Sequence, residues 1–184
     1  NSVHAKPATK DTLSAENLQQ FLYYFYEAQR LIQKEDLESA WELVQFCYEL
    51  NPNDATINNY MGVFRDAQGN PQDAMPFLRR AFELQPNEYW YQYAVYLLQS
   101  KDKKSEKIAI RNLEQVAKTN PENEELHGLL QKAYIHVKDY KRALLIQDKL
   151  DSICGYNAMS AMQRYRLNAI LQNNTQAIYE VERF

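Results

Sequence analysis

The sequence predicts an all-α protein built from about five helix-turn-helix repeats. Alanines that open a second helix recur in steps of 34, 35, 34 and 34 residues; they are Ala40, Ala74, Ala109, Ala143 and Ala177. The breaks between repeats follow at intervals of 34 or 35 residues, at Pro52, Pro86, Pro121 and Gly155. Two independent markers with one period indicate units that stack along the chain.

The stretch from Pro52 to Pro86 shows one repeat most clearly. Between Thr56 and Ala67 bulky apolar residues recur at spacings of three and four, which is typical of one helical face. Gly69-Asn70-Pro71 then predicts the end of one helix and the start of the next, because Gly tolerates a left-handed conformation and Pro suits a first helical turn. A second apolar face follows up to Leu84. Such a hairpin cannot bury both faces alone, so it needs neighbours.

The remaining elements follow from this unit. Residues 1–12 are polar and aperiodic and predict a flexible leader, whereas 13–184 form the helical-repeat domain. Its first helix is expected to begin after Ser14, which is a suitable N-cap. The repeats are expected at 21–54, 55–88, 89–123, 124–157 and 158–184, the last being truncated.

Two repeats contain residues that depart from the regular repeat pattern. The third is rich in aromatic residues between Tyr89 and Tyr93 and continues into a long basic loop, so we expect Ala94 to take the place that Gly62 holds in the second. In the second repeat, Pro76 lies inside the second helix and is expected to remove one hydrogen bond and bend it. The fourth repeat has a regular second helix from Tyr140.

The period and the small residues Gly62, Ala74 and Ala81, followed by Pro86, resemble the tetratricopeptide repeat (TPR) family over residues 21–184. The resemblance implies a right-handed α-solenoid whose first helices line a concave groove for an extended peptide or a partner helix. By position, the lining residues would be Phe25, Gln29, Ile32, Asn59, Val63, Asp66, Tyr93, Leu97, Lys132, Ile135 and His136. For each of these residues, packing against a neighbouring helix is the alternative.

Recognisable catalytic and cofactor motifs are absent from the sequence. It contains no glycine-rich phosphate loop, HExxH motif, nucleophile elbow or CxxC pair, so neither a catalytic site nor a cofactor or metal is predicted. His127 and His136 are interpreted as surface or groove residues, and Cys47 and Cys154 as small buried or half-buried thiols. The lysines from Lys101 to Lys107 are expected in a solvated loop.

Composition narrows the class of partner. A net charge of −3 disfavours nucleic acid as a partner, and no run approaches the roughly 18 apolar residues of a membrane span. The family's clamp for a C-terminal carboxylate, made of Lys, Asn and Arg, is also missing, since the matching positions hold Phe25, Gln29, Thr56 and Tyr60.

The sequence therefore favours a non-enzymatic scaffold that binds a protein or peptide. The truncated fifth repeat leaves an alternative open, a recruiting or regulatory arm of a larger chain whose catalytic or membrane-anchored domain lies beyond residue 184. The polar leader that starts at Asn1 and the abundance of Tyr, Gln and Asn favour an exported or periplasmic bacterial protein over a cytoplasmic one.

Overall fold

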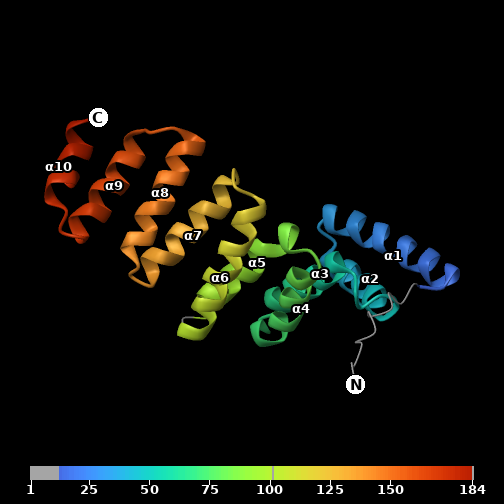
Figure 1. Ribbon diagram of the computed structural model, residues 1–184. Helices are drawn as coiled ribbons and strands as arrows, with labels where there is room; N and C mark the ends of the chain where they lie inside the picture. Colours follow the sequence, from blue (N-terminus) through green and yellow to red (C-terminus); the bar gives the residue numbers. More distant parts are fainter. Residues whose placement is uncertain (1–12, 101, 184) are drawn as a thin grey trace, which may run out of the picture. The chain divides into compact units, whose positions relative to one another are not determined.

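The computed structural model describes residues 13–100 and 102–183, which form ten α-helices and contain no strand. The chain divides into two compact units, one up to Leu84 and one from Gln85 (Figure 1). The predicted leader, residues 1–12, lies outside the described residues.

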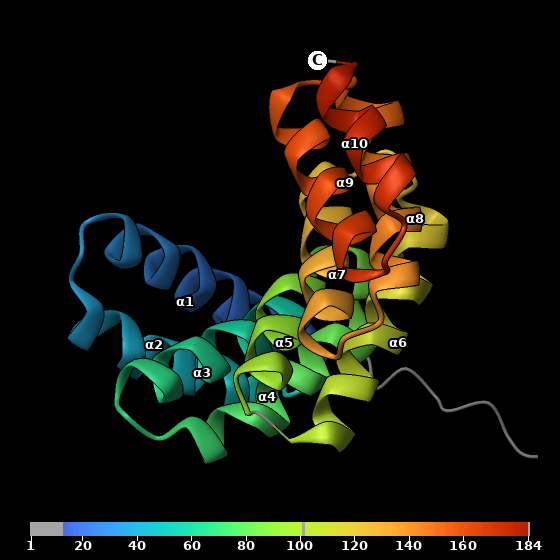
Figure 2. The same ribbon diagram turned by 90° about the vertical axis from the view of Figure 1, so that its left-hand side faces the viewer.

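Each unit is a series of antiparallel helices. The first contains α1 (Ala15–Gln33), α2 (Leu37–Leu50), α3 (Ala55–Ala67) and α4 (Pro71–Leu84). The second contains α5 (Pro86–Gln99), α6 (Lys103–Thr119), α7 (Glu124–His136), α8 (Tyr140–Cys154), α9 (Ala158–Ile170) and α10 (Asn174–Glu182). Within each unit every helix packs against the next one, and Figure 2 shows this stacking for α7 to α10.

Tight turns join the two helices of four repeats. Each turn has one residue with positive φ just past the first helix: Glu35, Gly69, Lys138 and Gln172. At Gly69 the backbone N–H donates to the carbonyl of Asp66, and the following N–H donates to the carbonyl of Arg65, which is a Schellman motif. The other three turns make the same pair of bonds. The residue after the positive φ immediately precedes the second helix, so the two helices fold back on each other.

The alanines that define the period are buried where the helices meet. Ala40, Ala74, Ala109 and Ala143 are fully buried, and Ala177 is nearly so. At Gly62 the two helices of the second repeat lie close together, because a Cβ built on it would lie 2.6 Å from Cδ2 of Leu78 and 3.3 Å from the carbonyl oxygen of Ala74. The prediction that small residues allow close helix packing is therefore confirmed.

The first repeat also begins as predicted. Ser14 caps α1, and its side chain accepts a hydrogen bond from the backbone N–H of Asn17 over 3.1 Å. In α4, Pro71 is the first residue and the helix continues through Pro76 to Leu84, so this proline does not end it. Pro76 has no N–H to donate to the carbonyl of Gln72, and one helical hydrogen bond is lost there.

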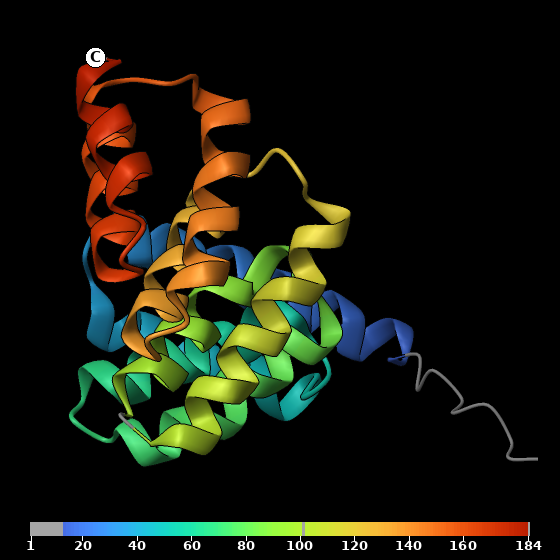
Figure 3. The same cartoon turned by 60° about the vertical axis from the view of Figure 1, so that its left-hand side comes forward.

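The third repeat differs from the prediction. The basic loop expected from Lys101 to Lys107 is short, because Asp102 caps α6 and the helix begins at Lys103. Lys103, Lys104 and Lys107 therefore lie on a helix instead of a solvated loop, whereas Lys101 lies outside the described residues. The connection from α8 to α9 is visible in orange in Figure 3. It contains Gly155, whose φ is positive.

Candidate functional site

The helices α3 and α7 bury equivalent residues that are 69 positions apart in the sequence. Ile57, Asn58, Met61 and Gly62 of α3 are buried, and so are Leu126, His127, Leu130 and Gln131 of α7. This register shows which positions of a first helix lie outside the core. We call these positions the first-helix surface, and the name is used for each unit by itself. In the first unit they are Phe25, Gln29 and Ile32 of α1 and Asn59, Val63 and Asp66 of α3; in the second unit they are Lys132 and Ile135 of α7.

In the first unit the first-helix surface combines half-buried and exposed side chains. Phe25, Gln29, Ile32 and Asn59 are half-buried. Phe25 packs against the hydrophobic core and stacks on Phe21, with 5.6 Å between the ring centroids. Val63 is 44% exposed, and Asp66 is also exposed. The surface of α3 thus offers an apolar side chain beside a carboxylate.

Asn59 has an unpaired polar atom. Its Oδ1 is buried and accepts no hydrogen bond from the described part of the chain. The neighbouring Asn58 is fully paired on the core side, because its Nδ2 donates to the carbonyls of Pro52 and Asp54 over 2.8 and 2.7 Å. A buried acceptor without a donor costs about 1–3 kcal/mol, so Asn59 gains from any donor that reaches it.

The third repeat does not contribute as predicted. Tyr93 and Leu97 of α5 are only 6% and 2% exposed, and Trp90 and Ala94 of the same helix are buried as well. Ala94 precedes Ala109 by 15 residues, whereas Gly62 precedes Ala74 by 12, so α5 is shifted in phase. We therefore exclude Tyr93 and Leu97 from the first-helix surface.

The predicted residues of α7 separate into two grooves. Lys132 is exposed and Ile135 half-buried, and both line a groove of about 400 Å³ between α7, α8 and the start of α9. His136, at the end of α7, lies in a different groove on α6 and α8. Of the residues predicted in the fourth repeat, only Lys132 and Ile135 thus share one surface.

A hydrogen-bonded network underlies the groove between α7, α8 and α9. Nε2 of Gln131 donates to Oε1 of Gln147 over 2.8 Å, and Nε2 of Gln147 donates to Oδ1 of Asp151 over 2.7 Å. From α9, Oγ of Ser160 and Nε of Arg164 donate to the two carboxylate oxygens of Asp151 over 2.5 and 2.6 Å. These polar side chains hold α7, α8 and α9 together.

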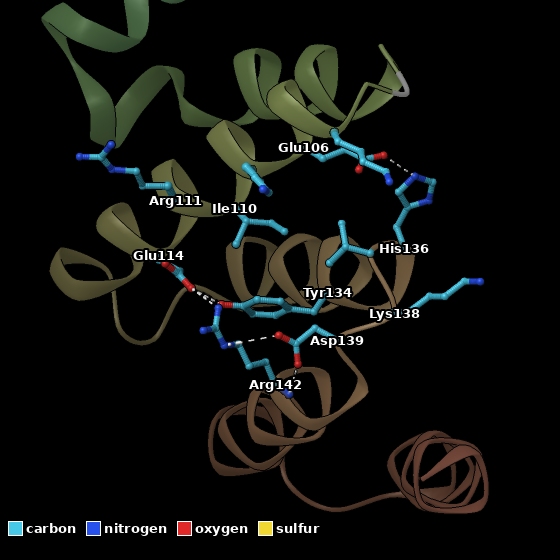
Figure 4. Close-up of a pocket in the computed structure, with 12 residues that line it drawn as sticks. Glu106, Ile110, Arg111, Glu114, Tyr134, His136, Lys138, Asp139 and Arg142 are labelled. Atoms are coloured by element: carbon cyan, nitrogen blue, oxygen red, sulfur yellow. Dashed lines mark hydrogen bonds and ion pairs between the residues drawn. The ribbon is translucent and has the colours of Figure 1, made fainter.

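A second groove lies between α6, the end of α7 and the start of α8. It has a volume of about 810 Å³, and Figure 4 shows its lining residues: Lys103, Glu106, Lys107, Ile110, Arg111, Glu114, Tyr134, His136, Val137, Lys138, Asp139 and Arg142. We call it the basic groove. At one side Nε2 of His136 lies 2.9 Å from Oε1 of Glu106. His136 is exposed, as predicted, but it faces this groove and not Lys132.

Tyr134 lies across the centre of the basic groove in Figure 4. Its hydroxyl donates a hydrogen bond to Glu114, and the guanidinium of Arg142 lies 5.7 Å from the centre of its ring. Burial, together with the hydrogen bond to the Glu114 carboxylate, raises the pKa of Tyr134 to about 12. Tyr134 therefore stays neutral at physiological pH and acts as a donor that holds Glu114 in place.

His127 is not a surface residue, which corrects the prediction. It is 5% exposed, and its Nδ1 lies 2.7 Å from the carbonyl oxygen of Asn123. It occupies the position that Asn58 holds in α3, where a side-chain nitrogen bonds the carbonyl of the helix-capping residue in the same way. His127 thus closes the first turn of α7 from inside the core.

The two thiols differ. Cys47 is fully buried as predicted, and burial, with a smaller contribution from Asp54, raises its pKa to about 12. Cys154 is exposed, contrary to the prediction, and lines the groove with Lys132.

The described residues contain no group of three or more His, Cys, Asp or Glu side chains that could hold a metal ion. Among the same residues, no helix has both the length and the apolarity that a membrane span requires.

No family model and no curated protein sequence matches the chain. Solved structures do. A MamA structure, "MamA 41-end from Desulfovibrio magneticus RS-1", has 18% identity and a TM-score of 0.70, and the match covers 94% of both chains. A crystal structure of MamA has 16% identity and a TM-score of 0.73 over 89% of both chains. YrrB, described as a TPR protein with an unusual peptide-binding site, has 16% identity and a TM-score of 0.73 over 93% of this chain and 91% of YrrB. The predicted all-α TPR fold is thereby confirmed.

Proposed function

We propose that the chain is a non-enzymatic scaffold that binds a protein or peptide partner on its first-helix surface. The observation that carries the proposal is the unpaired amide oxygen of Asn59 beside the exposed side chain of Val63. Because this oxygen is itself buried, the half-buried side chain of Asn59 would turn outward to accept a hydrogen bond from an N–H of a bound backbone. An apolar side chain of the partner would cover Val63. Both changes favour the bound state.

The fold likeness supports this proposal without identifying the partner. YrrB has the same fold and is described as having a peptide-binding site. In this chain Lys132, exposed beside the half-buried Ile135, offers a second combination of a polar and an apolar contact in the other unit. We infer that a partner contacts side chains of both kinds.

Asn59→Ala combined with Lys132→Ala is expected to reduce the recovery of bound partners about tenfold, because the loss of about 1.4 kcal/mol of binding free energy changes affinity by that factor. The measurement is a quantitative pull-down with the immobilised chain from a lysate of the source organism. The matched control is Gln72→Ala with Lys141→Ala, two exposed residues on second helices. Equal partner yields from both variants, at unchanged helicity by circular dichroism, would show that the first-helix surface is not the binding site.

The second candidate function is the recruiting arm of a larger protein. Three apolar side chains of α10 favour it, because Ile178, Tyr179 and Val181 are all more than half exposed. Apolar residues clustered on one helix favour coverage by another protein surface. The parent reading frame decides this alternative, and a stop codon soon after Phe184 would exclude a further domain in the same chain.

A further inference from the structure

We propose that the basic groove is a second docking surface, which binds an acidic segment of a partner protein. It is formed by α6, the turn after α7 and the start of α8, and none of its residues belongs to the first-helix surface. The proposal is therefore independent of the function proposed above.

The cations of the groove outnumber the available anions. Lys103, Lys107, Arg111 and Lys138 are exposed and make no ion pair or side-chain hydrogen bond with any residue in the described ranges. In Figure 4 Arg111 and Lys138 extend outward at opposite sides of the opening. An acidic ligand that lies across the groove would meet positive charge at both sides.

The acidic lining residues are already engaged. Glu106 lies against His136, and Glu114 accepts the hydrogen bond of Tyr134. Arg142 pairs with Glu114 and Asp139 over 3.6 and 3.5 Å. Asp139 also caps α8. The lining holds five Lys and Arg side chains against these three carboxylates, so the groove keeps a net positive charge.

Three cations on one face of α6 repel one another in the free protein. Lys103, Lys107 and Arg111 follow one another at intervals of four residues and so share one face of the helix. Like charges at this spacing repel each other and destabilise a helix. A ligand carboxylate placed among the three side chains would offset this repulsion. The three cations therefore favour the complex with an acidic ligand over the free protein.

The shape and the apolar lining favour an acidic protein segment over nucleic acid. The groove has a volume of about 810 Å³, and Ile110 and Val137 line it and offer apolar contacts to a bound side chain. A single-stranded nucleic acid would need an aromatic face for stacking, whereas Tyr134 is only 4% exposed. The occupant is therefore expected to combine carboxylates with apolar side chains.

The test uses fluorescence anisotropy with the full chain and a fluorescein-labelled dodecapeptide of repeating Glu-Glu-Leu. The same peptide with Gln in place of Glu and a dodecamer of deoxythymidine serve as competing probes. We expect the acidic peptide to bind at least about tenfold more tightly than the Gln peptide at low salt, and this difference to shrink as ionic strength rises.

Lys107→Glu separates binding from stability. The new carboxylate would pair with Lys103 and Arg111, so α6 should be as stable as before or slightly more so, while the affinity for the acidic peptide falls about tenfold or more. Lys141→Glu changes the net charge equally at an exposed position of α8 outside the groove and should leave the affinity within about twofold.

Three results would overturn the proposal. Equal losses in Lys107→Glu and Lys141→Glu would indicate diffuse charge attraction, and equal binding of the Gln peptide would remove the role of the carboxylates. A deoxythymidine probe that binds as tightly as the acidic peptide would identify a nucleic-acid surface instead. None of these outcomes bears on Asn59 or Lys132, so failure here leaves the function proposed above intact.

Discussion

Ala74→Leu is expected to lower the free energy of unfolding of the first unit by about 1–3 kcal/mol, because extra methylene groups would be forced into a close helix contact. Ala74 is fully buried, and its carbonyl oxygen would lie 3.3 Å from a Cβ on Gly62, so α3 leaves no room for a larger side chain. The measurement is urea-induced unfolding followed by circular dichroism.

Gln72→Leu provides the control for Ala74→Leu. It places the same side chain on the same helix at an exposed position, where substitutions usually change stability by less than about 0.5 kcal/mol. Similar destabilisation by both substitutions would mean that the period of the alanines does not report helix packing. The contrast therefore tests the repeat register directly.

Asp151→Ala is expected to lower the free energy of unfolding of the second unit by about 2–3 kcal/mol, somewhat less than the loss of one member of a fully buried ion pair. The carboxylate of Asp151 is 11% exposed and accepts hydrogen bonds from Gln147, Ser160 and Arg164. Without it, the amide, the hydroxyl and the guanidinium lose a shared acceptor at the junction of α8 and α9. Urea unfolding again provides the measurement.

Asp148→Ala is the matched control, because Asp148 pairs with the same guanidinium at 2.5 Å but is 55% exposed. An exposed ion pair contributes at most about 1 kcal/mol. If Asp148→Ala destabilised the unit as much as Asp151→Ala, the hydrogen-bonded network would have no special role in joining the helices.

The helix pairs could be predicted from the sequence because their packing depends on small residues at fixed intervals. Ala74 and its equivalents are buried where two helices meet, and Ser14 caps the first helix. Both features can be recognised from a few neighbouring residues in the sequence. In α5 the signal failed because aromatic residues occur on several sides of the helix. Trp90 and Tyr93 are buried, whereas Tyr91 is partly exposed, and periodicity alone did not distinguish them.

The polar interior of the second unit was not predicted because it depends on pairs of residues that are distant in the sequence. Gln131 and Gln147 occupy the positions that Gly62 and Leu78 hold 69 residues earlier, so an amide pair replaces a close apolar contact. Aligning the repeats at this offset would have revealed the exchange. The position of the lysines in the basic groove could have been predicted from Asp102. This residue is a suitable N-cap, and a helix that begins after it carries Lys103 and Lys107.

Photo-crosslinking from the first-helix surface tests the central claim most directly. A benzophenone amino acid is placed at Val63, which is 44% exposed on α3, or at Phe46, which is 53% exposed on α2. Both positions are apolar and accessible in the same unit, so they differ mainly in the helix that carries them. A partner that crosslinks from position 63 and not from position 46 is the predicted result. Crosslinking from position 46 alone would contradict the proposal that the first helices bind the partner.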